Sequence, residues 1–353
     1  MAKLSAAIVL AAGKGTRIKS SIPKVLLRMN GRSLVGHMHH AVAGLEPDHE
    51  VFVVRHERER VVEHLGEIAP NALIADQDDV KGTGRAAWCG LQALPADLEG
   101  AVLIVAGDSP MFTTEALADL LAAHGENAVT VLSTRVPDPD GYGRIMRDSF
   151  PGSSEVAGTP EATGPIVGIV EEKDATDLQR TINEIGTSTY IFDAKFLRES
   201  LGTLGTDNAQ GEMYLTDLIA KAAETGVGVG SFVLEDSIQA EGVNDLVQLA
   251  TLRAEKNRRI LEHWMRTGVH IIDPATTHVG CEVTLEPDAV VEPGTVLSGT
   301  THIGAFAHVG PHSQLENVEV GAGARLAHVV ASNVTVKESE QVPPFTVLGG
   351  ATE

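Results

Sequence analysis

The chain has 353 residues, a formal net charge of −21 and a hydrophobic content of 43%. This length suits about two domains, and the acidic balance argues against a nucleic acid or an anionic membrane as partner, since both require a broad basic face. No stretch reaches the roughly 20 apolar residues of a membrane span, and Cys89 and Cys281 are too few for a disulfide framework or a thiolate-rich zinc site. We therefore expect a globular cytoplasmic protein.

Apolar runs alternate with helical stretches along the first two thirds of the chain. The predicted strands are residues 6–10, 50–55, 101–108, 128–134 and 188–193. The predicted helices are residues 34–45, 84–94 and 114–125. This alternation indicates an α/β domain with a mainly parallel sheet. In such sheets ligands bind outside the carboxyl ends of the strands.

The first 45 residues contain several cations and no carboxylate, although the chain as a whole is acidic. A charge run often marks only a solvated helix face, but here Gly13 and Gly15 directly follow the apolar run 6–10. A glycine-rich turn after a buried strand lets backbone N–H groups converge on an anion, and nearby cations supply counter-charge. The turn matches neither a P-loop nor the dinucleotide motif, which needs a third glycine where Ile18 stands. The pattern predicts a phosphate site.

Asp108 ends the predicted strand 101–108, at the same sheet edge as the glycine turn. An aspartate followed by Ser109 and Pro110 fits a turn cap. It also fits a ligand of Mg²⁺, which prefers hard oxygen atoms and commonly takes one or two protein ligands together with substrate phosphates. The neighbouring phosphate turn favours the metal interpretation.

Seven ordered segments carry a family resemblance that runs to about residue 348. They read LAAGKGTRIKSSIPKVL, QDDVKGTGRAA, VAGDSPM, GYGRI, IVEEKDAT, NAQGEMYLTD and EGVNDLVQL. In order and spacing the chain resembles the bacterial N-acetylglucosamine-1-phosphate uridylyltransferases, the amino-terminal half of a bifunctional enzyme. The resemblance implies a Rossmann-like (GT-A-like) nucleotidyltransferase domain at 1–242, a linking helix at 243–268 and a short left-handed parallel β-helix at 269–353.

The resemblance also implies the site residues. Arg17 and Lys24 match the cations that hold the reacting phosphates, and Asp108 and Asn244 match two Mg²⁺ ligands. The residues implied to bind the nucleotide are Leu10, Ala11, Ala12, Gly13, Gly15, Thr16, Gln77, Gly82 and Thr83. The residues implied at the sugar are Gly143, Glu171 and Gly186.

The implied reaction needs few protein groups. An anionic sugar 1-phosphate attacks the α-phosphorus of a nucleoside triphosphate in line, and pyrophosphate leaves. Because the nucleophile is already charged, positioning, cations and Mg²⁺ suffice, and no covalent enzyme intermediate is required. The expected substrates are UTP and N-acetylglucosamine 1-phosphate.

Three departures from the family pattern leave the substrate open. Gly186 stands where the family has an asparagine that contacts the sugar, and the Gly-, Pro- and Ser-rich segment 147–165 is longer than usual. Lys81 and Arg85 replace a leucine and a histidine in the base segment. The alternatives are a nucleotidyltransferase for another sugar or cyclitol phosphate, possibly with another nucleotide, and a catalytically silent sensor or scaffold.

The carboxyl-terminal region has a six-residue rhythm of apolar residues, with a one-residue slip after Leu315. The repeating positions are Val279, Leu285, Val291, Leu297, Ile303, Val309, Leu315, Val320 and Leu326. Such a period is typical of a β-helix of stacked coils, and the resemblance implies that it assembles as a homotrimer. Because the sequence stops at residue 353, we expect no acetyltransferase activity from this polypeptide.

Overall fold

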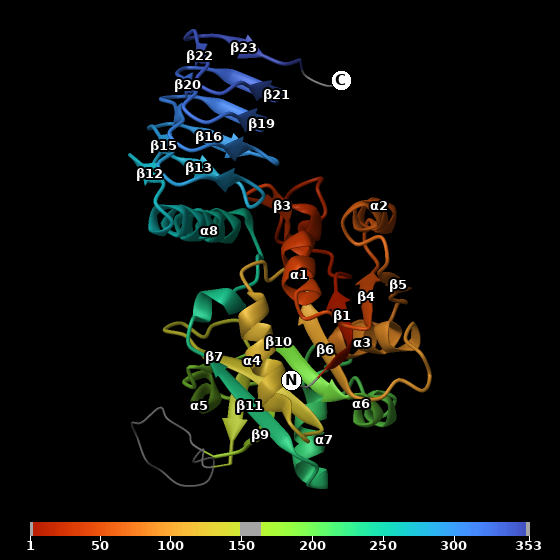
Figure 1. Cartoon of the computed structure of the whole chain (residues 1–353). Helices are drawn as coiled ribbons and strands as arrows, with labels where there is room; N and C mark the ends of the chain where they lie inside the picture. Colours follow the sequence, from red (N-terminus) through yellow and green to blue (C-terminus); the bar gives the residue numbers. More distant parts are fainter. Residues whose placement is uncertain (1–2, 149–163, 351–353) are drawn as a thin grey trace. The chain divides into compact units, whose positions relative to one another are not determined.

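The computed structural model describes residues 3–148 and 164–350. Its contacts divide the chain into unit 1, residues 1–27 and 34–245, and unit 2, residues 28–33 and 246–353 (Figure 1). The sequence-based division differs because it leaves residues 28–33 in the first domain. Most of the segment 147–165 lies outside the described residues. No helix of the described chain is long and apolar enough to cross a membrane.

Unit 1 is built on one mixed sheet with the strand order β11-β7-β10-β6-β1-β4-β5, and β8 and β9 join through β10. Its strands are β1 (Leu4–Leu10), β4 (His49–Val54), β5 (Leu73–Asp76), β6 (Ala101–Ala106), β7 (Val129–Arg135), β8 (Arg144–Arg147), β9 (Ile166–Val170), β10 (Glu184–Asp193) and β11 (Val229–Leu234). Its helices are η1 (Lys24–Leu26), α1 (Leu34–Ala43), α2 (Arg58–Ile68), α3 (Thr83–Gln92), α4 (Thr114–His124), α5 (Asp177–Arg180), α6 (Ala194–Leu201), α7 (Asp217–Thr225) and η2 (Ser237–Ala240).

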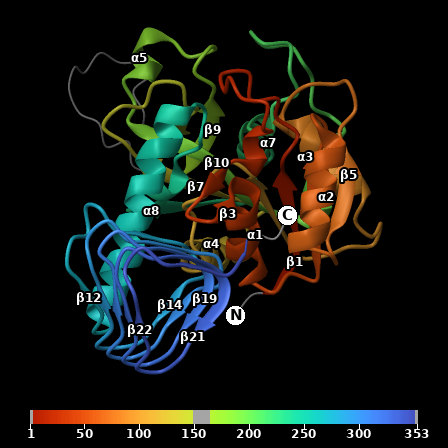
Figure 2. The same ribbon diagram turned by 90° about the horizontal axis from the view of Figure 1, so that it is seen from above.

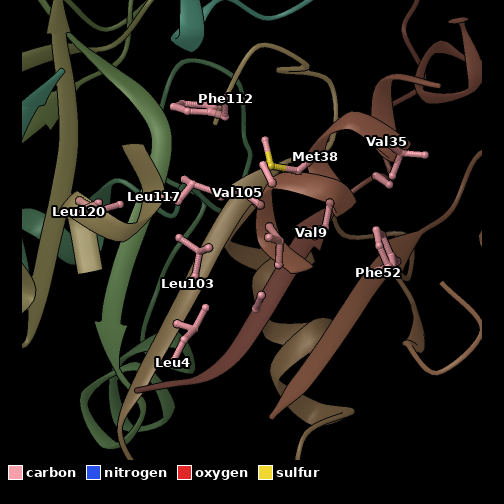
Figure 3. Close-up of a cluster of buried hydrophobic side chains, with 14 of the residues drawn as sticks. Leu4, Val9, Val35, Met38, Phe52, Leu103, Val105, Phe112, Leu117 and Leu120 are labelled. Carbon is pink, nitrogen blue, oxygen red and sulfur yellow. The ribbon is translucent and has the colours of Figure 1, made fainter. Parts of the chain in front are cut away.

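The central strands are buried on both faces, which explains their continuous apolar sequences. In β6, Leu103 and Val105 pack into one core, with α1 and α4, whereas Val102 and Ile104 pack into the other, with α3 and α7. Figure 3 shows the first of these cores, in which β1, β4 and β6 meet α1 and α4. The sheet is therefore a middle layer between helices, and its strand ends are left free to carry a site.

Every strand and helix predicted for unit 1 is present within a few residues, and the α/β class is confirmed. The sheet is less parallel than expected, because β10 runs antiparallel between β6 and β7. Among the described residues of unit 1, nine further elements of four residues or more were not predicted, and α5, α6, α7 and η2 are four of them. The other five are α2, β5, β8, β9 and β11, and they include strands that extend the sheet at β5 and β11.

Unit 2 begins with the long helix α8 (Leu246–Arg266) and continues as a left-handed parallel β-helix, whose coils overlie one another in Figure 2. The strands are β12 (His270–Ile271), β13 (His278–Val279), β14 (Thr284–Leu285), β15 (Val290–Val291), β16 (Val296–Ser298), β17 (His302–Ile303), β18 (His308–Val309), β19 (Gln314–Val320), β20 (Arg325–Leu326), β21 (Val330–Val336), β22 (Gln341–Val342) and β23 (Val347–Leu348).

The six-residue rhythm corresponds to one buried residue for each side of a coil. Leu285 pairs with Ile303 and Leu297 with Leu315, both 18 residues apart, so that three hexapeptides complete a coil. Ile303 pairs with Val320 only 17 residues on, and the slip in the sequence is therefore a coil shortened by one residue. All the repeating positions are at most 5% exposed.

The first coil is capped by two asparagines. Residues 28–33 form a hairpin of β2 (Arg28–Met29) and β3 (Arg32–Ser33) that groups with unit 2. Asn257 of α8 donates to the Thr277 carbonyl (2.9 Å) and accepts from the Val279 amide (3.0 Å). Asn30 donates from its side chain to the Val279 carbonyl (3.2 Å) and accepts at its own carbonyl from the Cys281 amide (2.9 Å). Together they satisfy the edge of β13 as a preceding strand would.

Candidate active site

The glycine turn after β1 is shaped by one position, Gly15. Its φ of +60° is a left-handed conformation that glycine adopts without strain, and the Ile18 amide donates to its carbonyl (2.9 Å). A Cβ atom at Gly15 would lie 2.9 Å from the Cβ of Lys24 and 3.2 Å from its Cδ. Glycine therefore lets the stem of Lys24 pack directly against the turn.

Four polar side chains from distant parts of unit 1 meet beside this turn. The ammonium of Lys24 forms an ion pair with Asp108, which directly follows β6 and Gly107. The same ammonium donates to Oδ1 of Asn244 (3.4 Å), and Arg17 donates to that atom from Nη2 (2.8 Å). The side chains of Lys24 and Asp108 are 11% and 26% exposed, so that the pair is largely shielded from water.

Backbone hydrogen bonds fix the segments that carry these side chains. The Gly107 amide donates to the Leu10 carbonyl (2.9 Å), which ties the end of β6 to the end of β1. The Val243 amide donates to the Asp108 carbonyl (3.0 Å), which holds Asn244 beside Asp108. The structure thus brings together Arg17, Lys24, Asp108 and Asn244.

The oxygen atoms of Asp108 and Asn244 have the chemistry of a Mg²⁺ site. A carboxylate and an amide carbonyl are hard donors, and both contact the one ammonium of Lys24, so that they already face a common positive charge. Within residues 3–148 and 164–350, no cluster of three or more His, Cys, Asp or Glu side chains has metal-binding geometry. The oxygen donors of Asp108 and Asn244 fit a magnesium ion by their chemistry.

A second group is formed by the base segment, the residues around Gln77, Gly82 and Thr83 that are predicted to bind the base of the nucleotide. The side-chain amide of Gln77 donates to the carbonyls of Val80 (3.0 Å) and Gly82 (3.3 Å). Gly82 has a φ of +113°, and a Cβ there would lie 2.2 Å from the Met213 carbonyl oxygen. The hydroxyl of Thr83 accepts from the Leu215 amide (3.2 Å). The segment therefore packs tightly against residues 213–215.

The remaining predicted nucleotide residues line the turn. Ala11 and Ala12 are buried, and the Ala11 amide donates to the Val53 carbonyl (2.8 Å). Gly13 and Thr16 are exposed, and the space where a Cβ of Gly13 would lie has no atom within 4 Å. The surface above Gly13 is open to a ligand.

The charge of Arg85, which stands where the family has a histidine, is paired within its own segment. Arg85 donates from Nε to both carboxylate oxygens of Asp78 (3.1 and 3.0 Å), within the same segment. The side chains of Arg85 and Asp78 are 28% and 45% exposed, and the hydrogen bond from Arg85 lowers the pKa of Asp78. Lys81 contributes its carbonyl, which accepts from the Met213 amide (2.9 Å).

The predicted sugar residues form a third group, on β8, β9 and β10. The Gly186 amide donates to the Gly143 carbonyl (2.9 Å). A Cβ at Gly143 would lie 2.9 Å from Cγ2 of Ile169 and 3.5 Å from Oε2 of Glu171. A Cβ at Gly186 would lie 3.3 Å from Cδ1 of Ile169 and 3.7 Å from that of Ile145. Isoleucine side chains therefore border the position where the family has an asparagine.

Glu171 is a half-buried carboxylate in an acidic neighbourhood. Burial raises the pKa of Glu171, and the carboxylates of Asp217, Asp174 and Glu212 raise it further. The hydroxyl of Thr216 donates to its Oε1 (3.0 Å), which opposes this shift. A carboxylate held in this way is suited to accept hydrogen bonds from the hydroxyl groups of a ligand.

No role is assigned from the sequence to the segment 208–216, which is part of the motif NAQGEMYLTD. The structure shows that it supports two groups of the candidate site. Met213 exchanges backbone hydrogen bonds with Lys81 (2.9 Å) and Gly84 (2.8 Å) of the base segment. Thr216 bonds Glu171 on the other side. One segment therefore supports both the second and the third group. The sequence offered only a conspicuous run of polar residues, and the contacts of Met213 are made by its backbone, which no side-chain pattern reveals.

The fold and the charged site together define a nucleotidyltransferase. Residues 7–169 match the family model of the MobA-like NTP transferase domain. The inositol-1-phosphate CTP transferase from T. maritima has a similar fold, with a TM-score of 0.50 at 18% identity over 66% of this chain and 86% of that one.

The chain belongs to the GlmU family. It is 49% identical over 350 residues to the bifunctional protein GlmU of Kineococcus radiotolerans, across 99% of this chain and 68% of the relative. It is 47% identical over 352 residues to the GlmU of Paenarthrobacter aurescens, again across 99% and 68%. These relatives align with both units of the structure.

Proposed function

We propose that the chain transfers a uridylyl group from UTP to N-acetylglucosamine 1-phosphate and releases pyrophosphate. The observation that carries the proposal is the convergence of Arg17, Lys24, Asp108 and Asn244 beside an open glycine turn. Two cations and two hard oxygen donors at the carboxyl ends of β1 and β6 suit a polyanion with its metal ion.

The chain's own residues position and neutralise the reactants. Backbone groups at Leu10–Gly13, Gly15 and Thr16 would line the nucleotide, with Gln77, Gly82 and Thr83 at the base. Lys24 would hold the reacting phosphates and Arg17 the departing pyrophosphate. The phosphate oxygen of the sugar 1-phosphate attacks the α-phosphorus, and the bond to the β-phosphate oxygen breaks. Two like-charged reactants approach each other only if these cations offset their repulsion.

Asp108 and Asn244 would hold Mg²⁺, which when bound supplies further positive charge to the phosphate oxygens. At the other end, Glu171 would accept hydrogen bonds from the sugar, while Gly143 and Gly186 leave it room. The nucleoside triphosphate is an intracellular substrate, so we also propose that the protein acts in the cytoplasm.

A second substrate class has one observation in its favour. Gly186 offers no side-chain polar group, and Ile169 lies 3.3 Å from the place of its missing Cβ. An apolar border of this kind suits a sugar or cyclitol phosphate that presents no amide at that point, because an unpaired polar group there costs about 1–3 kcal/mol.

The test is pyrophosphate release from the 353-residue chain with a panel of nucleoside triphosphates and sugar or cyclitol 1-phosphates, with Asp108→Asn as the inactive control. Release that is fastest with UTP and N-acetylglucosamine 1-phosphate supports the first proposal. Release with only another acceptor favours the second, and release with no pair favours a sensor or scaffold.

Unit 2 leads to a proposal about the oligomeric state. We propose a homotrimer assembled through the β-helix, supported by the exposed apolar side chains of Phe306 (64%), Val330 (51%) and Val347 (72%) on its surface. Light scattering of the full chain measures the mass directly.

A further inference from the structure

The ammonium of Lys24 has different partners in the structure and in the proposed function. The proposed function, on which this inference rests, assigns Lys24 and Arg17 to phosphates. In the structure, both cations bond instead to the oxygen atoms proposed as metal ligands: Lys24 contacts Asp108 and Asn244, and Arg17 donates to Asn244 (2.8 Å). A cation pair therefore covers the donors of the metal.

Lys24 and a divalent cation would compete for Asp108 in this arrangement. The Lys24 ammonium is in direct contact with Oδ2 of Asp108, and its side chain is only 11% exposed. Like charges at such a separation repel strongly, and salt screens them little when they are shielded from water. A metal ion therefore approaches Asp108 against this repulsion as long as the ammonium stays in place.

A triphosphate supplies the reason for the ammonium to move. It brings several negative charges to the turn, and the stem of Lys24 already packs against Gly15 of that turn, with 2.9 Å between the Lys24 Cβ and the position of a Gly15 Cβ. The end of the side chain can then rotate toward the phosphates while the stem keeps its place. The carboxylate that it leaves becomes available to the metal ion.

We propose that Lys24 and Arg17 act as exchangeable counter-ions at the metal ligands, so that a divalent cation binds weakly alone and cooperatively with a triphosphate. The two cations change partners from Asp108 and Asn244 to the phosphates, and the metal ion replaces them. By linkage, each ligand strengthens the binding of the other by the same factor.

The test measures Mn²⁺ binding to the full-length chain by water-proton relaxation, with and without inorganic tripolyphosphate. Tripolyphosphate has no base and supports no transfer, so the result does not depend on which nucleotide the protein uses. A protein-free mixture of Mn²⁺ and tripolyphosphate gives the blank. We expect Mn²⁺ to bind at least tenfold more tightly with tripolyphosphate present, and equal affinity in both conditions overturns the proposal.

Variants identify the residues responsible. Lys24→Gln should bind Mn²⁺ alone at least tenfold more tightly than the natural chain and lose most of the coupling, and Arg17→Gln should shift the same way by less. Lys195→Gln, an exposed lysine of α6, removes the same charge at a distance and should leave both affinities unchanged. Asp108→Asn should bind Mn²⁺ weakly in both conditions.

The outcomes separate this inference from the proposed function. If Lys24→Gln and Arg17→Gln both leave the affinity for Mn²⁺ alone unchanged, the inference is wrong even when nucleotidyl transfer is found. If the coupling is present but no nucleotide and acceptor pair releases pyrophosphate, the inference stands and the proposed function fails. Circular dichroism of each variant checks the fold, and Lys24→Met replaces Lys24→Gln if the latter does not fold.

Discussion

The candidate site has a proposed phosphate side, around Lys24 and Asp108, and a proposed sugar side, around Gly143 and Glu171. The two sides are built in different ways. On the phosphate side, Arg17 and Lys24 meet Asp108 and Asn244 through charge, from segments far apart in the chain. On the sugar side, the backbone of Gly143 and Gly186 lies against Ile169, and the half-buried Glu171 is the charged group. Charge tolerates small changes in shape, whereas a packed border of glycine and isoleucine responds to a single methyl group. Under the proposed function, the reaction class therefore depends on the phosphate side and the choice of sugar phosphate on the sugar side.

Removing charge from the phosphate side should have the largest effect. Asp108→Ala should lower kcat more than a hundredfold, equivalent to about 3 kcal/mol of transition-state stabilisation, because it removes a proposed ligand of the metal. The measurement is pyrophosphate release at saturating Mg²⁺. Asp119→Ala, an exposed aspartate of α4, is the matched control and should retain full turnover. Near-normal turnover of Asp108→Ala would show that the metal assignment is wrong.

Neutralising the sugar side should separate activity from stability. Glu171→Gln should raise the KM for the sugar phosphate about tenfold, because hydrogen bonds to a charged group are the stronger ones. Burial, the main cause, raises the pKa of Glu171, so that the folded state holds the proton more tightly than the unfolded state. Stability of the natural chain therefore falls as pH rises through the window between the ordinary and the raised pKa.

The same variant should consequently unfold at a higher temperature than the natural chain at pH 8. The difference should disappear well below the ordinary pKa of glutamate, at about pH 3, where the carboxyl group is protonated in both states. Thermal unfolding across this pH range measures it. A variant that is less stable at pH 8 would indicate that Glu171 is stabilised, not strained, by its surroundings.

Changing the border of the sugar side should have a moderate effect. Gly186→Asn alone should destabilise the fold by about 1 kcal/mol, because its Cβ would lie 3.3 Å from Ile169. Combining it with Ile169→Val removes the crowding methyl group. The double variant should raise kcat/KM for N-acetylglucosamine 1-phosphate about tenfold if a new polar contact forms. An unchanged kcat/KM would place the acceptor away from residue 186.

The smallest expected effect concerns the backbone beside that border. Ser188 has a φ of +56°, in the interruption of the β10–β7 ladder between Gly186 and Tyr190. Ser188→Gly should raise the free energy of unfolding by about 0.5–1 kcal/mol, because glycine adopts this conformation without strain. Ser188→Ala keeps the Cβ and should show no gain. Denaturant unfolding compares the three, and equal stability of all would mean that the strain is absorbed elsewhere.

The sequence predicted best those features that depend on a repeated or continuous apolar pattern. β1, β4 and β6 are buried on both faces, and the coils of the β-helix repeat one apolar residue every six, so both were recognisable. β8 and β9 have only four and five residues and owe their place to pairing with β10, which no local pattern records.

The same distinction holds within the site. Arg17 and Lys24 stand out as cations in an acidic chain, and Asp108 ends a clear strand. Asn244 was found only through the family resemblance, because it follows no strand and its place depends on the bond between Val243 and Asp108. Met213 was missed because its contribution is a backbone contact with a segment more than a hundred residues earlier.

The asparagine cap of the β-helix has a consequence for how the protein is made. Asn30 and its partner Val279 are separated by 249 residues, which at ribosomal speeds of about 5–20 residues per second is a delay of about 10–50 s. During synthesis the hairpin must wait for the strand that it will cover. Conversely, a fragment that starts at residue 246 would expose the edge of β13 to other chains, and such edges promote aggregation. The β-helix is therefore completed by residues that leave the ribosome long before its first coil.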